Sequence, residues 1–226
     1  LKAQSYAQAV VQLKPNTISE EEAFAAFKDF VGGSREQVSK GLMDRFDLEQ
    51  AAQERMEEFS ASEPWQVLTR LRLQIYEEII SDEKTLQEAA WKHNLDLLQQ
   101  VRDANCKVAL ATMSHCTQAG RSLRALNLET AFDFIATRED VQNPKPDPEI
   151  YLLVAKELDV STSELIVVED SVAGVRAGLA SGASVLAVAN PMTKQQLHQS
   201  GLLDEQFIVD GPEALQEKMA NLFRQA

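Results

Sequence analysis

The sequence is poor in the residues that hold disulfide-rich and zinc-binding proteins together. It contains two cysteines, Cys106 and Cys116, which permit at most one disulfide. Two reduced thiols in a sheet-based cytoplasmic protein are the more ordinary interpretation of such low cysteine use. The three histidines, His93, His115 and His198, are scattered along the chain without metal-ligand spacing, so a zinc site is not expected.

Basic residues are outnumbered by acidic ones. The sequence has 22 Lys and Arg residues and 35 Asp and Glu residues, which gives a net charge of -13. Nucleic acids and anionic membrane surfaces bind to basic faces, so neither is expected as a partner. No apolar run approaches the length of a membrane-spanning helix. The first residues also lack the apolar core of a signal peptide, and we therefore expect a cytoplasmic protein.

The first 86 residues show helical periodicity and no strand pattern. Ser19 and Ser34 each precede a Glu or Gln by three residues, which predicts capped helix starts. Pro64 fits the first turn of a further helix, whose apolar residues follow at helical spacing. We predict a small helical bundle over residues 1–86.

Strand and helix patterns alternate over residues 87–226. The predicted strands are 107–112, 132–136, 165–169, 184–189 and 206–209. The last helix is predicted to begin near Pro212. Such alternation is typical of a parallel sheet with right-handed crossover helices. The predicted fold class is therefore α/β, with a parallel-sheet domain that follows the helical one.

Hydroxyl side chains follow the first predicted strand. Thr112 ends this strand, and Ser114 comes two residues later. A hydroxyl and backbone N–H groups at a strand-to-helix turn can hold a phosphate oxygen. The alternative is an ordinary helix cap, which these residue types also provide.

A lysine framed by prolines lies in the loop after the second predicted strand. Lys145 stands between Pro144 and Pro146. Proline restricts its own backbone and that of the preceding residue, so the frame fixes the direction of the lysine. A lysine that must meet a phosphate and a carboxylate needs such a frame. The alternative is a proline-rich surface turn.

Two adjacent acids, Glu169 and Asp170, follow the four apolar residues of the third predicted strand. Ligands of open α/β sheets bind at the carboxyl ends of strands. Two neighbouring carboxylates repel each other unless a cation lies between them, and Mg²⁺, which takes oxygen ligands, is the expected one. The alternative is that both acids only stabilise the start of the next helix. Hydroxyl, lysine and acid pair, each after its own strand, together predict a site for a phosphorylated ligand with Mg²⁺.

Three segments resemble a known family: Ala-Leu-Ala-Thr112, Lys145-Pro-Asp-Pro-Glu-Ile-Tyr151 and Val-Val-Glu-Asp-Ser-Val-Ala-Gly174-Val-Arg-Ala-Gly178. They are similar to the second, third and fourth motifs of the haloacid dehalogenase superfamily, in its phosphatase and β-phosphoglucomutase-like branch. The resemblance covers nearly the whole chain. It implies a Rossmann-like core, an N-terminal helical cap, and Mg²⁺-dependent phosphoryl transfer through an aspartyl-phosphate intermediate.

The resemblance also implies roles for single residues. Thr112 would hold the phosphoryl oxygens, and Lys145 would offset charge on the nucleophile and the phosphate. Asp170, with help from Glu169, would hold Mg²⁺. The segment Val31-Gly-Gly-Ser-Arg35-Glu resembles the part of the cap that reaches toward the substrate, so Arg35 would contact an anionic substrate.

One motif of the family is absent from the sequence. The family's nucleophile and general acid/base lie in Asp-x-Asp-Gly at the end of its first strand, and no Asp-x-Asp-Gly occurs here. Without a carboxylate nucleophile, covalent transfer of the family type is unavailable. The first strand is central in the family, so its loss would leave backbone groups unpaired, at about 1–3 kcal/mol for each buried group. We expect a partner segment that completes the sheet, a sheet that closes up, or an upstream segment encoded by the gene.

Two functions follow from these observations. The first is a hydrolase of the haloacid dehalogenase type that acts on a small phosphorylated metabolite and is inactive without the missing nucleophile. The second is a non-catalytic, truncated relative that binds a phosphorylated ligand or a protein partner.

Overall fold

The computed structural model describes residues 1–211, 214–215 and 217–219. The chain divides into two compact units, Leu1–Thr85 and Leu86–Ala226, which are called the helical unit and the sheet unit below. The sequence predicts the domain boundary after residue 86, one residue later than this division. The helix predicted near Pro212 begins outside the described residues. None of the helices in the described part of the chain combines the length and the apolar character that crossing a membrane requires.

The helical unit is built from five helices and one short 3-10 turn. They are α1 (Lys2–Leu13), α2 (Glu20–Phe27), η1 (Lys28–Phe30), α3 (Arg35–Phe46), α4 (Glu49–Gln53) and α5 (Pro64–Ser81). Ser34 forms a complete capping box with Gln37, and Ser19 Oγ accepts from Glu22 N. The capping box predicted for Ser19 and Glu22 is thus confirmed in one of its two bonds. Pro64 occupies the first turn of α5, where its missing N–H is not needed.

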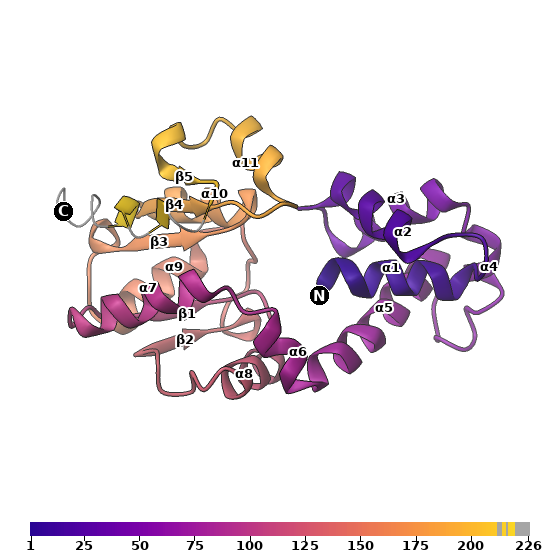
Figure 1. Cartoon of the computed structure of the whole chain (residues 1–226), viewed down its shortest axis with the longest axis horizontal. Helices are drawn as coiled ribbons and strands as arrows, with labels where there is room; N and C mark the ends of the chain where they lie inside the picture. The colour runs from indigo at the N-terminus through magenta and orange to yellow at the C-terminus, as the bar shows by residue number, and fades with distance from the viewer. Residues whose placement is uncertain (212–213, 216, 220–226) are drawn as a thin grey trace. The chain divides into compact units, whose positions relative to one another are not determined.

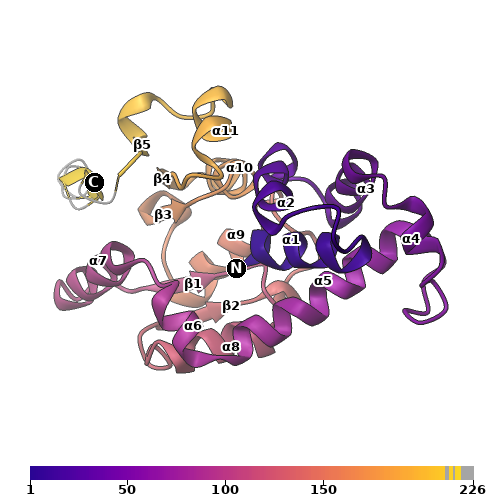
Figure 2. The ribbon, with the colours of Figure 1, turned by 45° about the vertical axis from the view of Figure 1, so that its right-hand side comes forward.

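The core of the helical unit forms around α5, which packs against α1, α3 and α4 (Figure 2). The apolar face predicted for α5 consists of Leu68, Leu71, Ile75 and Ile79, of which the first three are buried and Ile79 is half-buried. One polar pair lies within this core, where the hydroxyl oxygens of Ser39 and Thr69 are 2.7 Å apart. The helical periodicity of the sequence therefore predicts the buried side of this helix correctly.

The sheet unit follows α6 (Glu83–Glu88), a short helix at the boundary between the units, and alternates helices with strands (Figure 1). Its elements are α7 (Lys92–Asp103), β1 (Ala109–Ala111), α8 (Cys116–Ala125), β2 (Phe134–Ala136), η2 (Arg138–Asp140), α9 (Glu149–Leu158), η3 (Thr162–Glu164), β3 (Ile166–Glu169), α10 (Val172–Ser181), β4 (Ser184–Val188), α11 (Lys194–Gln199), η4 (Glu205–Phe207) and β5 (Ile208–Val209).

All strand pairs in the described part of the chain are parallel, as the sequence predicts for an α/β fold. β1 pairs with β2, and β4 lies between β3 and β5 in a second sheet. α9 packs against β1, β2 and α10, while α10 packs against β3 and β4. One apolar cluster therefore joins side chains of both sheets, from Ala136 in β2 to Val167 and Val185 in the second sheet.

β1 and β3 each have one edge without a strand partner among the described residues. β1 bonds to β2 and β3 bonds to β4, but β1 and β3 do not bond to each other. Val168 of β3 is 40% exposed, and Leu110 of β1 is half-buried. Parallel strands are normally covered on both faces, so the exposure of Val168 is unusual for an apolar side chain of a parallel strand. The expectation that a further strand belongs between these edges stays a prediction.

All five strands of the described residues are shorter than their sequence patterns predict, β1 and β5 by the largest share. β1 occupies three residues of the predicted 107–112, although Asp133 N donates to Val108 O and Thr112 N donates to Ala136 O just outside it. β5 begins at Ile208, because the preceding residues form the 3-10 turn η4. An apolar run shows where a strand can form, whereas its length depends on the partner strand beside it.

Candidate functional site

Thr112 and Ser114 lie where β1 leads toward α8. Thr112 N–H donates to Ala136 O over 2.9 Å, so the pairing with β2 continues to this residue. Thr112 Oγ1 accepts from Ser114 N–H at 3.0 Å. The residue that caps α8 is His115, which makes no side-chain capping bond. The predicted alternative, in which Thr112 or Ser114 caps this helix, is therefore wrong.

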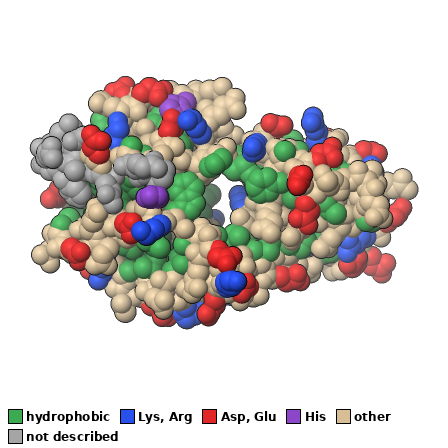
Figure 3. All heavy atoms as spheres, viewed as in Figure 1, with side chains coloured by type: hydrophobic (Ala, Val, Ile, Leu, Met, Phe, Trp, Pro, Cys, Tyr) green, Lys and Arg blue, Asp and Glu red, His purple; other side chains and the backbone are tan. Residues whose placement is uncertain are grey.

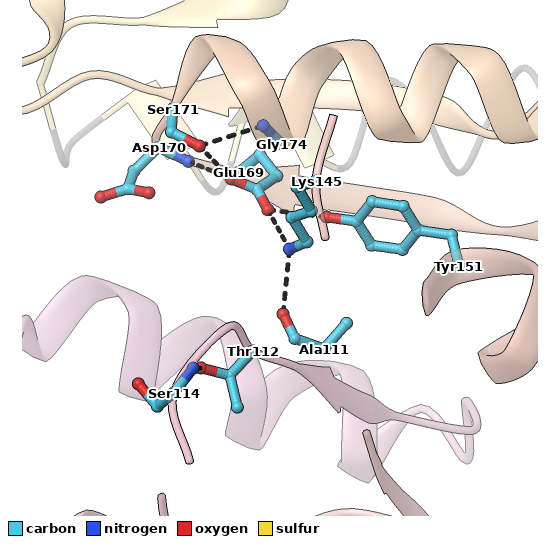
Figure 4. A network of polar contacts seen from close by, with 9 residues as sticks. All are labelled: Ala111, Thr112, Ser114, Lys145, Tyr151, Glu169, Asp170, Ser171 and Gly174. Atoms are coloured by element: carbon cyan, nitrogen blue, oxygen red, sulfur yellow. Dashed lines mark hydrogen bonds and ion pairs between the residues drawn. The ribbon is translucent and has the colours of Figure 1, made fainter. Parts of the chain in front are cut away.

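Lys145 connects the ends of β1 and β3. Its Nζ donates to Ala111 O at 3.0 Å and to Glu169 Oε1 at 2.5 Å (Figure 4). The same ammonium lies 4.7 Å from the ring centroid of Tyr151, a favourable cation–π distance. The Lys145 side chain is 9% exposed. A surface turn would leave this lysine in solvent, so the proline-framed loop instead directs it into the protein.

Glu169 is held by four donors of the sheet unit. Oε1 accepts from Lys145 Nζ and, at 2.7 Å, from the Tyr151 hydroxyl. Oε2 accepts from Asp170 N–H at 3.1 Å and from Ser171 Oγ at 3.2 Å. A carboxylate offers about four acceptor positions. The four hydrogen bonds from described residues therefore occupy the acceptor positions of the Glu169 carboxylate.

Charge and burial act in opposite directions on this network. Burial alone would raise the pKa of Glu169, but the Lys145 ammonium and the hydrogen bonds to the carboxylate hold that pKa below its usual value. Burial raises the pKa of Tyr151, and the negative charge of Glu169 raises it further. Glu169 is thus ionised and Tyr151 is protonated, as the hydrogen bond between them requires.

Gly174 makes room for the Glu169 carboxylate. A Cβ atom at Gly174 would lie 2.0 Å from Glu169 Cδ and Oε2, far inside van der Waals contact. Gly178, one turn later, brings α10 close to the sheet, because a Cβ there would lie 2.8 Å from Val185 Cγ2. Both glycines therefore allow the start of α10 to approach the end of β3.

Asp170 is exposed at the end of β3, and Asn190 Nδ2 donates to its Oδ2 at 3.3 Å. The start of α10 is capped by Ser171, whose Oγ accepts from Gly174 N–H at 3.1 Å. Because a serine already caps this helix, the alternative that the acid pair merely caps it is unnecessary. The two acids have different environments: Glu169 is enclosed by donors, and Asp170 is at the surface.

The carboxylates at the end of β3 fit a Mg²⁺ site only in part. Within the described ranges, no group of three or more His, Cys, Asp or Glu side chains is arranged to hold a metal ion. Mg²⁺ is usually bound by one or two carboxylates together with substrate phosphates and several waters. Asp170 suits such a minimal site, whereas Glu169 is already bonded to Lys145 and Tyr151.

The structure brings five of the six predicted site residues to one edge of the sheet unit. Thr112 and Ser114 adjoin Ala111, whose carbonyl binds Lys145, and Lys145 binds Glu169 next to Asp170 (Figure 4). The sixth, Arg35, is exposed at the first position of α3 in the helical unit and contributes nothing to this hydrogen-bond network.

Several residues that complete the network are not predicted as site residues by the sequence. Tyr151 belongs to a segment that resembles the family motif, yet it reads as an apolar-face residue of α9. Ser171 and Asn190 are ordinary polar residues in their sequence context. Gly174 belongs to the segment that resembles the fourth family motif, so its place in the sequence does indicate a particular kind of turn into the helix. Its clearance for Glu169 depends on how α10 meets β3, which no local pattern predicts.

Comparison with known proteins places the chain in a family. The family model described as haloacid dehalogenase-like hydrolase matches residues 3–188. A phosphorylated carbohydrates phosphatase of Thermotoga maritima is 37% identical over 108 residues, which cover 48% of this chain and 46% of that protein. The chain thus matches about half the length of this relative.

Solved structures of the same kind share the fold. A HAD family hydrolase from Deinococcus radiodurans R1, solved with bound phosphate and sodium, has a TM-score of 0.67 at 20% identity, covering 97% of this chain and 89% of that one. A β-phosphoglucomutase from Clostridium difficile has a TM-score of 0.58 at 22% identity, covering 99% and 93%. At such identities these likenesses support the α/β fold alone. The match over residues 3–188 shows that the chain belongs to the haloacid dehalogenase-like hydrolase family.

Proposed function

We propose that the sheet unit binds the phosphate group of a small phosphorylated metabolite, together with Mg²⁺, as part of a phosphatase or phosphomutase. The observation that carries this proposal is the position of Lys145, which joins the ends of two separate parallel strands. Ligands of parallel α/β sheets bind at this edge. Membership of the family and a relative named for phosphorylated carbohydrates favour sugar phosphates as the substrate class.

The residues of the site suit a phosphate group. An ammonium has three N–H donors, and Lys145 uses two of them for Ala111 O and Glu169 Oε1. The third would donate to a phosphate oxygen, with the hydroxyls of Thr112 and Ser114 as further donors. Glu169 would act by orienting Lys145. Asp170 would hold Mg²⁺, which supplies charge neutralisation when it is bound.

Turnover needs a nucleophile that these residues do not provide. The 226 residues contain no Asp-x-Asp-Gly, and a lysine, two hydroxyls and a metal ligand position a phosphate without attacking it. We propose that an aspartate-bearing strand completes the enzyme, from a partner segment or from an upstream part of the gene. The second candidate function, binding of a phosphorylated ligand without turnover, would need no such strand.

Phosphate binding is tested by NMR. Inorganic phosphate is titrated into the protein with and without MgCl₂, and the backbone amide signals of Thr112 and Ser114 are followed. We expect saturable shifts that tighten with Mg²⁺ and a loss in affinity of about tenfold or more in Lys145→Met, because a charge-assisted hydrogen bond is removed. Lys156→Met removes an exposed lysine of α9 and serves as the control. Equal affinity of the two variants would contradict the proposal.

Turnover separates the two candidate functions. Release of inorganic phosphate from p-nitrophenyl phosphate and hexose phosphates is measured with Mg²⁺ and with EDTA. We expect no release by the 226 residues alone, and Mg²⁺-dependent release once a strand that carries Asp-x-Asp-Gly is supplied. Failure of every such strand to restore release would favour the binding protein. Release by the 226 residues alone, abolished in Lys145→Met, would show that another group is the nucleophile.

A further inference from the structure

Glu139 is an exposed acid of η2, the 3-10 turn that follows β2, and it lies outside the three segments that resemble the family motifs. Its carboxylate contacts the start of α8, where Oε1 lies 2.6 Å from His115 Nδ1 and Oε2 accepts from Cys116 N–H at 3.1 Å. Both residues belong to the segment 112–116, called the hydroxyl loop below, which carries the two hydroxyls proposed to bind phosphate. One side chain from the turn after β2 therefore holds the end of the loop after β1.

The hydroxyl loop leaves the regular strand pairing at Thr112. Ala111 pairs with Ala136, and Thr112 N–H donates to Ala136 O at 2.9 Å. Strict continuation of this parallel register would take the next bond, from Arg138 N–H, to Thr112 O. That bond reaches Ser114 O instead, at 3.1 Å. Between these bonds the loop has two more residues than the segment opposite it, so regular pairing does not fix its conformation.

The turn that carries Glu139 is itself well held. Asp140 Oδ2 accepts from the N–H and the hydroxyl of Thr137, each at 2.7 Å, and Thr137 is buried. Arg138 Nη1 donates to Val141 O at 2.7 Å. The backbone that bears Glu139 is therefore anchored on both sides by contacts outside the hydroxyl loop.

The start of α8 relies on Glu139 for one of its hydrogen bonds. His115, the residue before the helix, makes no side-chain capping bond, and the first N–H groups of a helix have no partner within it. Glu139 accepts from one of these groups, the N–H of Cys116, and its negative charge suits the positive end of the helix dipole. Because α8 begins where the hydroxyl loop ends, this bond also restrains the loop.

The charge state of Glu139 fixes how it bonds to His115. The hydrogen bond to His115, together with backbone hydrogen bonds of the carboxylate, holds the pKa of Glu139 at about 2 against the effect of burial. Glu139 is thus ionised near neutral pH, and an ionised carboxylate only accepts hydrogen bonds. The hydrogen between the two residues therefore belongs to His115 Nδ1. This contact restrains the imidazole, whose side chain is 47% exposed, at the end of the hydroxyl loop.

A carboxylate near a phosphate site acts on the ligand in two opposite ways. Its negative charge repels the phosphate and weakens binding. Its hydrogen bonds to the loop reduce the conformational freedom that the loop would otherwise lose on binding, which strengthens binding. The sign of the change in affinity when the carboxylate is removed therefore reveals which effect is larger.

We propose that Glu139 is a positioning residue of the phosphate site. Through His115 and Cys116, it holds the hydroxyl loop in the conformation that presents both hydroxyls to a phosphate group. Glu139 makes no contact with the phosphate itself. The identity of the ligand rests on the function proposed above, whereas the restraint on the loop is a property of the ligand-free protein and can be measured without phosphate.

The first test separates the reach of the side chain from its charge. Inorganic phosphate is titrated with MgCl₂ into the full chain, and the amide signals of the hydroxyl loop are followed by NMR. Glu139→Ala loses both reach and charge, and Glu139→Asp keeps the charge on a shorter side chain, so we expect both to bind phosphate about threefold to tenfold more weakly. Glu139→Gln keeps the reach and an oxygen acceptor, so it should retain the wild-type affinity within about twofold. Glu157→Ala removes the same charge from an exposed position of α9 and is the control.

The second test observes the hydroxyl loop without ligand. In Glu139→Ala we expect the amide hydrogen of Cys116 to exchange about tenfold faster, because its acceptor is gone. The amide signals of Thr112 and Ser114 should broaden as the loop samples other conformations. The ¹⁵N shifts of the His115 ring should lose the signature of a hydrogen held on Nδ1. The amide signals of α10 should not change.

Phosphate affinity in Glu139→Ala that equals or exceeds that of the wild type would overturn the proposal, because repulsion would then be the larger effect. Wild-type affinity in Glu139→Asp together with tighter binding in Glu139→Gln would overturn it as well. If the wild type does not bind phosphate, the proposed function fails, and the ligand-free measurements decide the role of Glu139: unchanged exchange and line widths in the hydroxyl loop overturn it. If Glu139→Ala does not fold, Glu139→Asp and Glu139→Gln decide.

Discussion

The two units of the molecule each bury one cation against a tyrosine ring, but they compensate its charge differently. In the sheet unit, Lys145 lies 4.7 Å from the ring of Tyr151 and donates to the carboxylate of Glu169. In the helical unit, Arg72 lies 4.9 Å from the ring of Tyr6, and no acid faces it among the described residues. The aromatic neighbour is common to both, whereas the anionic partner is present in one.

The difference between the units lies in whether the buried cation has an acidic partner within the protein. The Lys145 charge is neutralised within the protein, so that lysine holds a fixed position before any ligand arrives. The Arg72 charge has no acidic partner among the described residues, so contacts with the rings of Tyr6 and Tyr76 are what offset its desolvation cost. Surface charge does not explain the contrast, because acidic side chains are spread over both units on the face shown in Figure 3.

The largest expected effect comes from breaking the compensated pair. Glu169→Ala leaves Lys145 buried without its acid, and we expect a loss of roughly 3–5 kcal/mol in the free energy of unfolding. Arg72→Met removes a cation that has no acid to leave behind, so it should cost far less. Urea unfolding of both variants measures the contrast.

Glu157→Ala is the matched control for the first variant, since Glu157 is an exposed acid of α9. It should change the free energy of unfolding by no more than about 0.5 kcal/mol. A similar small loss for Glu169→Ala would mean that the Lys145–Glu169 pair contributes nothing, and the comparison between the units would fail.

The two tyrosine hydroxyls give the next largest contrast. Tyr151→Phe removes a donor to the charged Glu169 carboxylate, and we expect a loss of about 1.5–3 kcal/mol. Tyr6→Phe removes a buried hydroxyl that has no hydrogen-bond partner among the described residues, so it should be neutral or stabilising. Denaturant unfolding of both variants tests this pair. A larger loss for Tyr6→Phe would show that its hydroxyl is already bonded.

Two glycines of the sheet unit provide a steric contrast. A Cβ at Gly174 meets the Glu169 carboxylate at 2.0 Å, whereas the nearest atom to a Cβ at Gly120 of α8 is an arginine side-chain nitrogen at 3.6 Å. Gly174→Ala should therefore cost about 1–3 kcal/mol. Gly120→Ala should stabilise by about 0.5–1 kcal/mol, because alanine favours the helix. Thermal unfolding of the two variants in parallel measures both, and equal effects would contradict the assigned crowding.

The smallest expected effect concerns an exposed pair. Glu139 Oε1 lies 2.6 Å from His115 Nδ1, and this hydrogen bond, which acts against the effect of burial, lowers the pKa of Glu139 to about 2. A lowered folded-state pKa adds stability above the unfolded value near 4.5, and this stability is lost as the pH falls toward 2. NMR titration of the Glu139 carboxyl carbon should show this midpoint.

His115→Ala tests the cause of that shift. The variant should bring the Glu139 pKa back toward its ordinary value and remove at pH 7 the stability that the lowered pKa adds, an effect that solvent screening of this exposed pair keeps small. A pKa that stays near 2 in His115→Ala would assign the shift to the backbone N–H of Cys116, which donates to Glu139 Oε2 at 3.1 Å.

Sequence patterns predicted the local features of both units. The Ser34 capping box, the buried face of α5 and the alternation of strand and helix all depend on residues within a few positions of one another. The order of Thr112, Lys145 and Asp170 after successive strands predicted that they meet, because parallel strands end at one edge. Arg72 carried a weaker signal, since it falls on the apolar face between Leu68 and Ile75.

The tertiary structure alone decided how these charges are compensated. Glu169 bonds to Lys145 across 24 residues of sequence, and Gly174 leaves room for it through the approach of α10 to β3. The missing acid beside Arg72 depends in the same way on which helices surround it. The sequence fixes periodicity and capping through near neighbours, whereas partners of buried charges come from distant segments that only folding brings into contact.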